Sequence, residues 1–530
     1  MAIINSDEKP DIEHRESDGV KETLSLSRDE LEALDSIEHT HAGKFAWLAS
    51  LTAALGGLLF GYDTGIIAAT LVYINKSLDN HILSASDKEL ITSITSGTAF
   101  FGALFAGLLA DRFGRRPPIF IGCVLFIAGA VIQAASSTIS QMTVGRAVVG
   151  LGVGSASMVV PMYIAEISPA RYRGRMVGLD NASITGGQLI SYGIGAAFAN
   201  VHGGWRYMVG GGALPAILLM VLLVFCPESP RQLIYHNKPQ EAAAVLRRIY
   251  PLATDKQVDD KVRHITFYVE LDKNIAGNKS LWYNLRQVYV IGANFRATVA
   301  ACGLMAISQL CGFNSLMYYS PTLFALVGFK NAVAVGTVIA GTNFIFTIFN
   351  MFVVDRVGRR RILLITLPLM GIFLIIAAVM FGYIPINLKT LEVIPGTSPG
   401  AHEIVVLICM VFFVGSYSSG CGNTAWLSSE FFPMEIRAMG TMMLAMTAWA
   451  SNVIVSSTFL TQMKNTTPSG AFGFYAGICM AGWVCVYFCY PEVKGITLEE
   501  ISKLFQHGFG VKEARQIQKE RKARRNNVAV

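Results

Sequence analysis

The sequence predicts an all-α membrane protein of twelve transmembrane helices, in two pseudo-symmetric six-helix bundles with a cytoplasmic helical loop domain between them. Three observations support this fold class: the composition, the apolar runs and an internal repeat. Hydrophobic residues make up 52% of the chain and charged residues only 15%, whereas a soluble protein carries about 25% charge. The chain also has 50 glycines, and small residues are frequent where membrane helices pack closely.

Twelve apolar runs are each long enough to cross a bilayer as a helix, which takes about 20 residues. They cover residues 45–71, 89–110, 118–138, 142–165, 176–200, 207–226, 297–320, 331–354, 362–383, 403–427, 438–461 and 470–490. The first run is too long for a removable signal peptide and has no cleavage site. The nine cysteines all lie in apolar runs, so we interpret them as small buried hydrophobic residues and expect no metal site.

Charged motifs occur twice, once in each half of the chain and at matching spacing. The first copies are DRFGRR at 111–116, the set Glu166, Pro169 and Arg173, and the pair Pro227-Glu228. The second copies are DRVGRRR at 355–361, the set Glu430, Pro433 and Arg437, and the pair Pro491-Glu492. Such a repeat is typical of transporters whose two halves rock against each other around a central site.

Basic residues follow the second, fourth and eighth apolar runs, and the positive-inside rule then places both termini in the cytoplasm. The expected parts are a disordered cytoplasmic tail at 1–42, bundles at 43–226 and 294–491, an intracellular helical loop at 227–293 and a basic cytoplasmic tail at 492–530. Within the loop, Pro239 followed by EAAAVLRRIY predicts a short helix with Pro in its first turn. The basic tail either contacts anionic lipid or is simply solvated.

Asp63 lies in the middle of the first apolar run, within GYDTG. A charge at that depth is costly, so the carboxyl should face the bundle interior and have a partner. Arg146 in the fourth run is the candidate partner. Burial and a nearby cation act in opposite directions on such a carboxyl, which suits it to bind and release a proton. The alternative is a static ion pair that fixes helix packing.

Amide and aromatic side chains form a second polar set inside the apolar runs. We expect the substrate-binding residues to be Gln188, Gln309, Asn314, Asn343, Trp426, Trp449 and Asn452. Amides donate and accept hydrogen bonds, and indole offers a flat apolar face, so the site should bind a neutral, hydroxyl-rich molecule. Each single amide could instead join two helices. Tyr318 and Tyr319 are expected to gate the site. Helices that can bend are marked by Gly312 and Pro321 in the seventh run and by Gly415, Gly420 and Gly422 in the tenth.

The repeated charged motifs contain acids that membrane topology alone does not require. We expect them to form ion pairs between helices that clamp the cytoplasmic side when the site faces outward, because a network of pairs can bias a two-state equilibrium. The expected clamp residues are Asp111, Arg115, Arg116, Glu166, Arg173, Asp355, Arg359, Arg360, Glu430 and Arg437.

Taken together, these motifs resemble those of the sugar porters of the major facilitator superfamily, across residues 45–505. The resemblance lies in GYDTG, DRFGRR, PESPR at 227–231, the GFN run before Tyr318, DRVGRR and PEVKG. The end of the chain, SSTFLTQMKNTTPSGAFGFYAG and FCYPEVKGITLEEI, is most similar to the fungal myo-inositol/proton symporters. The resemblance implies that Asp63 couples the proton with Arg146 as partner, and that the amides and Trp426 contact the sugar.

The resemblance implies a secondary active transporter that imports myo-inositol by proton symport with alternating access. A hexose or other polyol as substrate, a passive uniporter and a transporter-like nutrient sensor stay open as alternatives. We expect a small polyol, a proton and the lipid bilayer as partners, no nucleic acid, and function as a monomer in the plasma membrane. The sequence contains no nucleophile–base set and no nucleotide-binding loop, so we expect no enzymatic activity and no cofactor.

Overall fold

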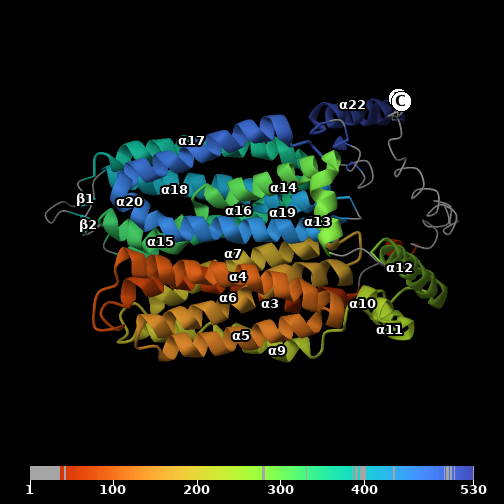
Figure 1. Ribbon diagram of the computed structural model, residues 1–530, viewed down its shortest axis with the longest axis horizontal. Helices are drawn as coiled ribbons and strands as arrows, with labels where there is room; N and C mark the ends of the chain where they lie inside the picture. The colour runs from red at the N-terminus through yellow and green to blue at the C-terminus, as the bar shows by residue number, and fades with distance from the viewer. Residues whose placement is uncertain are drawn as a thin grey trace, which may run out of the picture.

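The computed structural model describes residues 36–40, 43–276, 281–329, 331–384, 386–387, 392–393, 401–433, 436–494, 496, 501, 504–506 and 508–528. Long, roughly parallel helices form two bundles that lie side by side, the N-terminal half in red to yellow and the C-terminal half in green to blue (Figure 1). The seam between the bundles therefore runs along the length of the helices.

Six spans make up the N-terminal half. They are α3 (Lys44–Tyr73), α4 (Ala85–Phe113), α5 (Arg116–Ala135), α6 (Ile139–Ile167), α7 (Arg173–Ala197) and a sixth span divided into α8 (Gly204–Gly210) and α9 (Ala213–Leu223). Local sequence explains where these helices begin. Ser84 and Asp87 form a capping box at the start of α4, and α5 begins with prolines in its first turn.

The C-terminal half repeats this arrangement with two broken helices. Its elements are α14 (Gly292–Leu310), α15 (Phe313–Leu326), α16 (Ala332–Val357), α17 (Arg359–Phe381), α18 (Ala401–Ser419), α19 (Cys421–Leu427), the 3-10 helix η2 (Ser428–Phe431) and α20 (Arg437–Cys489). The long α20 comprises two helices, because Thr467 has φ 70° immediately before Pro468. This break matches the boundary between the eleventh and twelfth predicted spans.

Among the described residues, ten helices are long and apolar enough to cross a membrane. One of them, Met439–Cys489, contains the last two predicted spans. The fifth predicted span, α7, is not among the ten because its first half is rich in polar residues and glycine. The observed helices therefore account for all twelve predicted spans, and the predicted fold class is confirmed.

The seventh and tenth spans are interrupted at two of the positions that the sequence singled out, whereas Pro321, Gly415 and Gly422 lie inside α15, α18 and α19. Gly312 lies between α14 and α15 with φ 90°, a conformation that favours glycine. Gly420 separates α18 from α19 with φ −128° and ψ −92°. The predicted bends are therefore present at corresponding places in both parts of the C-terminal half, next to the central cavity described below.

The two ends of the molecule carry different small elements (Figure 1). One end, called the loop end here, carries α10 (Pro230–Tyr235), α11 (Pro239–Ile249), α12 (Asp255–Ala276), α13 (Leu281–Val290) and α22 (Val511–Val528). The opposite hairpin end carries the antiparallel pair β1 (Ile386–Asn387) and β2 (Glu392–Val393), in which Ile386 pairs with Val393. The helix predicted after Pro239 is confirmed as α11.

The segment expected to be a disordered tail is ordered at its end. Ser36–His39 forms the 3-10 helix η1, and Ile37 is fully buried. Glu38 accepts hydrogen bonds from Lys261 Nζ at 2.8 Å and from the backbone N–H of Ala170 at 2.7 Å. Burial alone would raise the pKa of Glu38, but Lys261 and these hydrogen bonds outweigh it and lower the pKa. For these residues the expectation of disorder is therefore wrong, because their side chains have partners on α12 and the α6–α7 turn.

A stripe of glycines brings α3 and α7 into close contact. A Cβ atom on Gly61 would lie 1.8 Å from the carbonyl oxygen of Ile184, and one on Gly65 would lie 2.0 Å from Ser191 Oγ. Small residues at this spacing let two membrane helices approach at backbone distance. The contact fixes Asp63 of α3 and Gln188 of α7 relative to each other at the seam between the halves.

Candidate functional site

A polar cavity lies at the seam between the two halves, with residues of both bundles in its wall. All seven residues predicted to bind substrate line it: Gln188, Gln309, Asn314, Asn343, Trp426, Trp449 and Asn452. They come from both bundles, on α7, α14, α15, α16, α19 and α20. The structure thus brings together residues that are as much as 264 positions apart, while their role in binding stays a prediction.

Hydrogen bonds link the cavity amides to each other. Asn343 Nδ2 donates to Gln188 Oε1 at 2.7 Å, and this bond crosses from the C-terminal to the N-terminal half. Ser418 Oγ in turn donates to Asn343 Oδ1 at 2.6 Å. On the opposite wall, Asn314 Nδ2 donates to Gln309 Oε1 at 2.5 Å. These bonds hold the amides in fixed orientations and leave further donors and acceptors for a ligand.

Aromatic rings form the apolar part of the wall. Trp449 contacts Phe60 across the seam, with ring centroids 5.4 Å apart and planes inclined by 53°. Phe313 and Tyr417 stack at 3.8 Å. Two buried polar atoms of the wall have no hydrogen-bond partner in the described part of the chain, namely Trp449 Nε1 and Asn452 Oδ1. Buried polar groups without partners are uncommon, so these two atoms are available to a bound molecule.

The cavity also contains residues that sequence reasoning did not select. They include Phe60, Asn181, Thr347, Tyr417 and Asn423. Asn181 lies seven residues before Gln188, which is two helical turns along the same face of α7. Asn423 lies three residues before Trp426 on α19. Helical spacing from the predicted residues would have found both.

Asp63 and Arg146 contact each other inside the N-terminal half. Arg146 Nη1 lies 2.5 Å from Asp63 Oδ1, and the two residues are 1% and 6% exposed. The guanidinium also donates from Nε to the carbonyl oxygen of Ile91 at 3.2 Å. A pair this deeply buried is costly to break by removing one partner. The predicted partnership is present in the structure, while proton coupling by Asp63 stays a prediction.

The predicted gate residues lie beside this pair, on α15. Tyr319 donates from its hydroxyl to the carbonyl oxygen of Ser456 at 2.8 Å and stacks on Phe459. The hydroxyl of Tyr318 accepts a hydrogen bond from Asn452 Nδ2 at 3.3 Å. Both rings are buried, 5% exposed or less. Tyr318 and Tyr319 thus separate the cavity from the hairpin end of the molecule.

Further contacts join the two halves near the hairpin end. Tyr192 of α7 donates to the carbonyl oxygen of Met317 at 2.5 Å and lies 2.7 Å from Ser320 Oγ. Glu89 of α4 accepts hydrogen bonds from the backbone N–H and the hydroxyl of Thr461, at 2.7 and 2.6 Å. The hairpin end of the seam is therefore closed by direct hydrogen bonds between the bundles.

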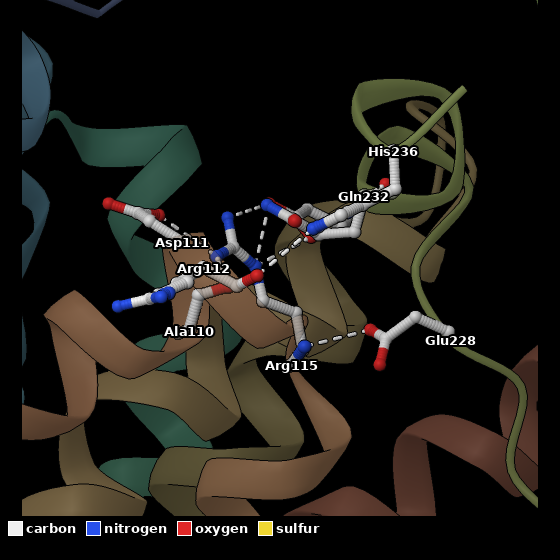
Figure 2. Close-up of polar contacts among 8 residues, drawn as sticks. Ala110, Asp111, Arg112, Arg115, Glu228, Gln232 and His236 are labelled. Atoms are coloured by element: carbon white, nitrogen blue, oxygen red, sulfur yellow. Dashed lines mark hydrogen bonds and ion pairs between the residues drawn. The ribbon is translucent and has the colours of Figure 1, made fainter. Parts of the chain in front are cut away.

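Arg115 is the centre of the first charged motif at the loop end. Its guanidinium contacts Glu166 Oε1 at 2.8 Å and Asp111 Oδ1 at 3.1 Å. Its backbone N–H donates to Glu228 Oε1 at 2.8 Å, as Figure 2 shows. Burial alone would lower the pKa of Arg115, but Glu166 and Asp111 outweigh this effect and raise it. Arg115 therefore stays charged and ties α4, α6 and the segment before α10 together.

The helical loop contacts the same motif. His236, which follows α10, places Nε2 3.0 Å from the carbonyl oxygen of Arg112 and Nδ1 2.9 Å from that of Gln232 (Figure 2). The loop segment therefore holds the turn between α4 and α5 at both ends. His236 contacts the backbone of Arg112 before the turn, and Glu228 contacts the backbone of Arg115 after it.

The second motif repeats this arrangement. Glu492 accepts from the backbone N–H groups of Arg359 and Arg360, each at 3.1 Å. Arg359 Nη2 lies 3.8 Å from Glu430 Oε1. Glu228 and Glu492 were not predicted as clamp residues, although the sequence signalled them through the repeated Pro-Glu pairs. Glu228 caps the first turn of α5 and Glu492 caps the first turn of α17, the helices that begin at the charged motifs. An anion is favoured at the start of a helix.

Not all predicted clamp residues form ion pairs. Arg116 Nη2 donates to the carbonyl oxygen of Val224, and Arg360 Nη2 to that of Tyr487. For Arg116 and Arg360 a carbonyl takes the place of the expected acid partner within the described residues, because nearby helix ends leave carbonyl groups unpaired. Arg437 donates to the carbonyl oxygen of Phe432. Arg173 is exposed at the start of α7, and the side chain of Asp355 lies outside the described residues.

Two helical bundles around a polar cavity, with a buried ion pair and paired charged motifs, define a membrane transporter rather than an enzyme. A family model described as Sugar (and other) transporter matches residues 49–505. The chain belongs to this family and is a multi-pass membrane protein. The match covers both bundles and the helical loop between them.

Individual relatives agree with this assignment. Myo-inositol transporter 1 of Cryptococcus neoformans is 44% identical, with 90% of this chain and 84% of the relative aligned. Myo-inositol transporter 1 of Candida albicans is 41% identical over 95% and 90% of the two chains. Among solved structures, the proton:xylose symporter XylE bound to 6-bromo-6-deoxy-D-glucose superposes with a TM-score of 0.71 at 27% identity, covering 87% of this chain and 99% of that one. XylE from E. coli in a partially occluded inward-open conformation gives a TM-score of 0.69.

Proposed function

We propose that this protein imports myo-inositol together with a proton, as a secondary active transporter working by alternating access in the plasma membrane. The loop end, with both termini, faces the cytoplasm, and one chain is the functional unit. The observation that carries the proposal is the position of the cavity: amides from both halves meet there, next to the buried Asp63–Arg146 pair. The myo-inositol transporters among the relatives support the choice of substrate.

The chemistry of the wall favours a neutral polyol. None of the described lining residues is Lys or Arg, so the cavity offers no cation for an anionic substrate. Its amides and the free Trp449 Nε1 and Asn452 Oδ1 supply donors and acceptors in the mixture that hydroxyl groups require. The Trp449 and Phe60 rings supply an apolar surface for the C–H groups of the ring.

The buried ion pair supplies the coupling. A proton on Asp63 removes its negative charge and so weakens its attraction to Arg146, which frees α3 to move relative to α6. With the membrane potential at 100 mV, one entering proton supplies about 2.3 kcal/mol. A tenfold proton gradient adds about 1.4 kcal/mol. Together these support accumulation of roughly several hundred-fold.

The proposed transport cycle alternates between closing the hairpin end of the seam and opening the loop end. In the outward-facing state Asp63 takes a proton and the polyol binds among the amides and Trp426. The α15 segment then closes over the site, bending at Gly312, with Tyr318 and Tyr319 sealing the hairpin end. As the halves rock, the loop end opens and the polyol and proton leave to the cytoplasm.

Uptake of labelled myo-inositol into cells that express this protein tests the proposal. Uptake should be saturable, should collapse on addition of a protonophore, and should be competed by inositol isomers more strongly than by hexoses. Asp63→Asn should abolish accumulation while the protein still reaches the membrane. Uptake of myo-inositol that is unchanged by the protonophore would indicate a uniporter. Purified protein that moves no polyol in liposomes would indicate a sensor.

A further inference from the structure

One buried acid has no place in the cycle described so far. Asp180 lies on α7, seven residues after the helix begins at Arg173. It is 5% exposed, and its Oδ1 has no hydrogen-bond partner among the described residues. The described α7 residues that line the cavity, Asn181, Ile184, Thr185 and Gln188, are all uncharged, so a carboxyl beside them requires an explanation.

The surroundings of Asp180 are shaped to hold its carboxyl group. A Cβ atom on Gly57 of α3 would lie 2.4 Å from Asp180 Oδ1 and 2.8 Å from its backbone carbonyl oxygen. Any side chain at position 57 would therefore occupy the space that the carboxyl uses. The absence of a side chain at Gly57 gives the acid a pocket of its own between the two helices.

No cation compensates this acid within the described part of the chain. Of the charged groups on helices packed against α7, Asp63 on α3 and Arg146 on α6 are paired with each other. Glu166 on α6 pairs with Arg115, Arg206 on α8 donates to the carbonyl oxygens of Ala134 and Ser136, and Lys44 is exposed at the start of α3. Arg356 is exposed at the loop end of α16, and the side chain of its neighbour Asp355 lies outside the described residues. An isolated carboxylate is costly in such a setting, so the carboxyl holds a proton while it is buried and loses it when water reaches it.

Asp180 lies between Asp63 and the loop end. The helices α3 and α7 run in the same direction, because Gly57, Gly61 and Gly65 face Asp180, Ile184 and Gln188 in turn. Gly57 precedes Asp63 by six residues, which is roughly 9 Å along a helix. The neighbouring Asn181 lines the cavity. Asp180 therefore lies beside a cavity-lining residue, on the loop-end side of Asp63.

We propose that Asp180 is a second proton-binding carboxyl, which receives the proton released from Asp63 and passes it to water at the loop end. This inference rests on the proton symport proposed above. In the first step the loop end opens, the O–H bond on Asp180 breaks and its proton goes to cytoplasmic water. In the second step the O–H bond on Asp63 breaks and, through water between the two acids, one forms on Asp180, so that Asp63 regains its charge and its pairing with Arg146 and the halves return empty.

If Asp180 releases the proton, its loss should impair net proton-driven uptake but not the exchange of internal for external myo-inositol. Net proton-driven uptake requires the proton to leave on the cytoplasmic side in every cycle. Exchange of internal for external myo-inositol does not, because the carrier can return loaded with both substrate and proton. An acid that only fills space between α3 and α7 would affect both modes together, since both use the same conformational change.

The experiment compares the full-length wild type, Asp180→Asn, Asp180→Ser and Asp63→Asn in proteoliposomes, with labelled myo-inositol as the probe. For Asp180→Asn we expect accumulation driven by an imposed proton gradient to fall at least tenfold, while exchange at equal pH stays within twofold of wild type. Asp180→Ser removes the carboxyl with a smaller side chain and should give the same pattern, which covers the case that the amide is poorly accommodated against Gly57.

Normal proton-driven accumulation by either folded Asp180 variant would overturn this inference. An equal loss of accumulation and exchange in both variants would also overturn it, in favour of a packing role. The wild-type protein distinguishes failure of the Asp180 inference from failure of the proposed proton symport. If its uptake does not respond to a proton gradient, the proposal of symport fails first and the role of Asp180 fails with it.

Discussion

At the scale of single residues, the polar side chains of the apolar runs decide where the site lies. A polar group at membrane depth must face the protein interior, because lipid offers it no hydrogen bond. Seven such residues meet at one cavity, and Asp63 and Arg146 meet beside it. Burial of this kind is informative because a group of the cavity wall that lacks a partner among the described residues can bind one that arrives from outside.

Trp449 provides a direct test of that reasoning. Trp449→Phe keeps an aromatic ring against Phe60 and removes only the indole N–H, which has no partner in the described part of the chain. If the N–H binds a substrate hydroxyl, its loss should raise the KM for myo-inositol about tenfold, equivalent to about 1.4 kcal/mol. Initial uptake rates over a range of inositol concentrations measure this change.

Trp205→Phe is the matched control. Trp205 is also buried with an unpartnered Nε1, but it does not line the cavity. The KM of the Trp205→Phe variant for myo-inositol should stay at the wild-type value. Equal KM values for the wild type and the Trp449→Phe variant would show that the indole does not contact the substrate.

The α7 residues that escaped prediction, Asp180 and Asn181, share a physical reason. The first half of α7, RGRMVGLDNASITGG, is so rich in polar residues and glycine that Asp180 and Asn181 do not contrast with an apolar background. Asp63, Gln309 and Asn343 each interrupt an apolar run and are conspicuous for that reason. Sequence reasoning therefore identifies polar residues in strongly apolar helices and overlooks those in the more polar helix at the seam.

At the scale of elements, the helix boundaries and bends follow from local sequence, whereas their tertiary partners do not. Gly312 and Gly420 predict the breaks in the seventh and tenth spans, because glycine tolerates the backbone angles that a break requires. The bond from the Arg115 backbone to Glu228 joins residues 113 positions apart. No local signal specifies such a pairing, although the repeated Pro-Glu pairs indicated that the position matters.

Gly114, in the turn between α4 and α5, is packed closely against Glu228. Its φ is 95°, and a Cβ atom would lie 2.6 Å from Glu228 Oε2. Gly114→Ala should therefore strain the backbone by about 1–2 kcal/mol and displace the carboxylate that caps α5. We expect the midpoint of thermal unfolding of the purified protein to fall by several degrees, measured by loss of monodisperse protein on heating in detergent.

Gly174→Ala is the control for this substitution. Gly174 lies in the first turn of α7, and a Cβ atom there would meet nothing within 4 Å. This variant should unfold at the wild-type temperature or slightly above it, because alanine favours a helix more than glycine does. A Gly114→Ala variant as stable as Gly174→Ala would show that the close approach of Glu228 is unimportant.

At the scale of the whole molecule, the two ends of the seam are held differently. At the hairpin end, hydrogen bonds from Tyr192 to Met317 and from Thr461 to Glu89 connect one half to the other. At the loop end, Arg115 pairs with Asp111 and Glu166, all in the N-terminal half, and Arg359 lies near Glu430 in the C-terminal half. These loop-end pairs stiffen each bundle as a unit, which allows the bundles to rock as rigid bodies.

Glu89 should therefore control how often the hairpin end opens. Its carboxylate accepts two hydrogen bonds from Thr461 of the opposite half, and bonds to a charged group contribute about 1.5–3 kcal/mol each. Glu89→Gln keeps an acceptor oxygen but loses the charge and turns one acceptor into a donor. A cost of about 1.4 kcal/mol would shift the balance of states about tenfold towards the form that is open at this end.

Labelling of a cavity cysteine measures that shift. In an Asn314→Cys background, a membrane-impermeant maleimide applied outside intact cells should react about tenfold faster when Glu89→Gln is added, with the native cysteines as the measured background. Asp87→Asn is the matched control, because Asp87 caps its own helix through Ser84 and does not reach the other half. Its labelling rate should equal that of the background. Unchanged labelling in Glu89→Gln, or the same increase in both variants, would show that closure of the hairpin end does not depend on this contact.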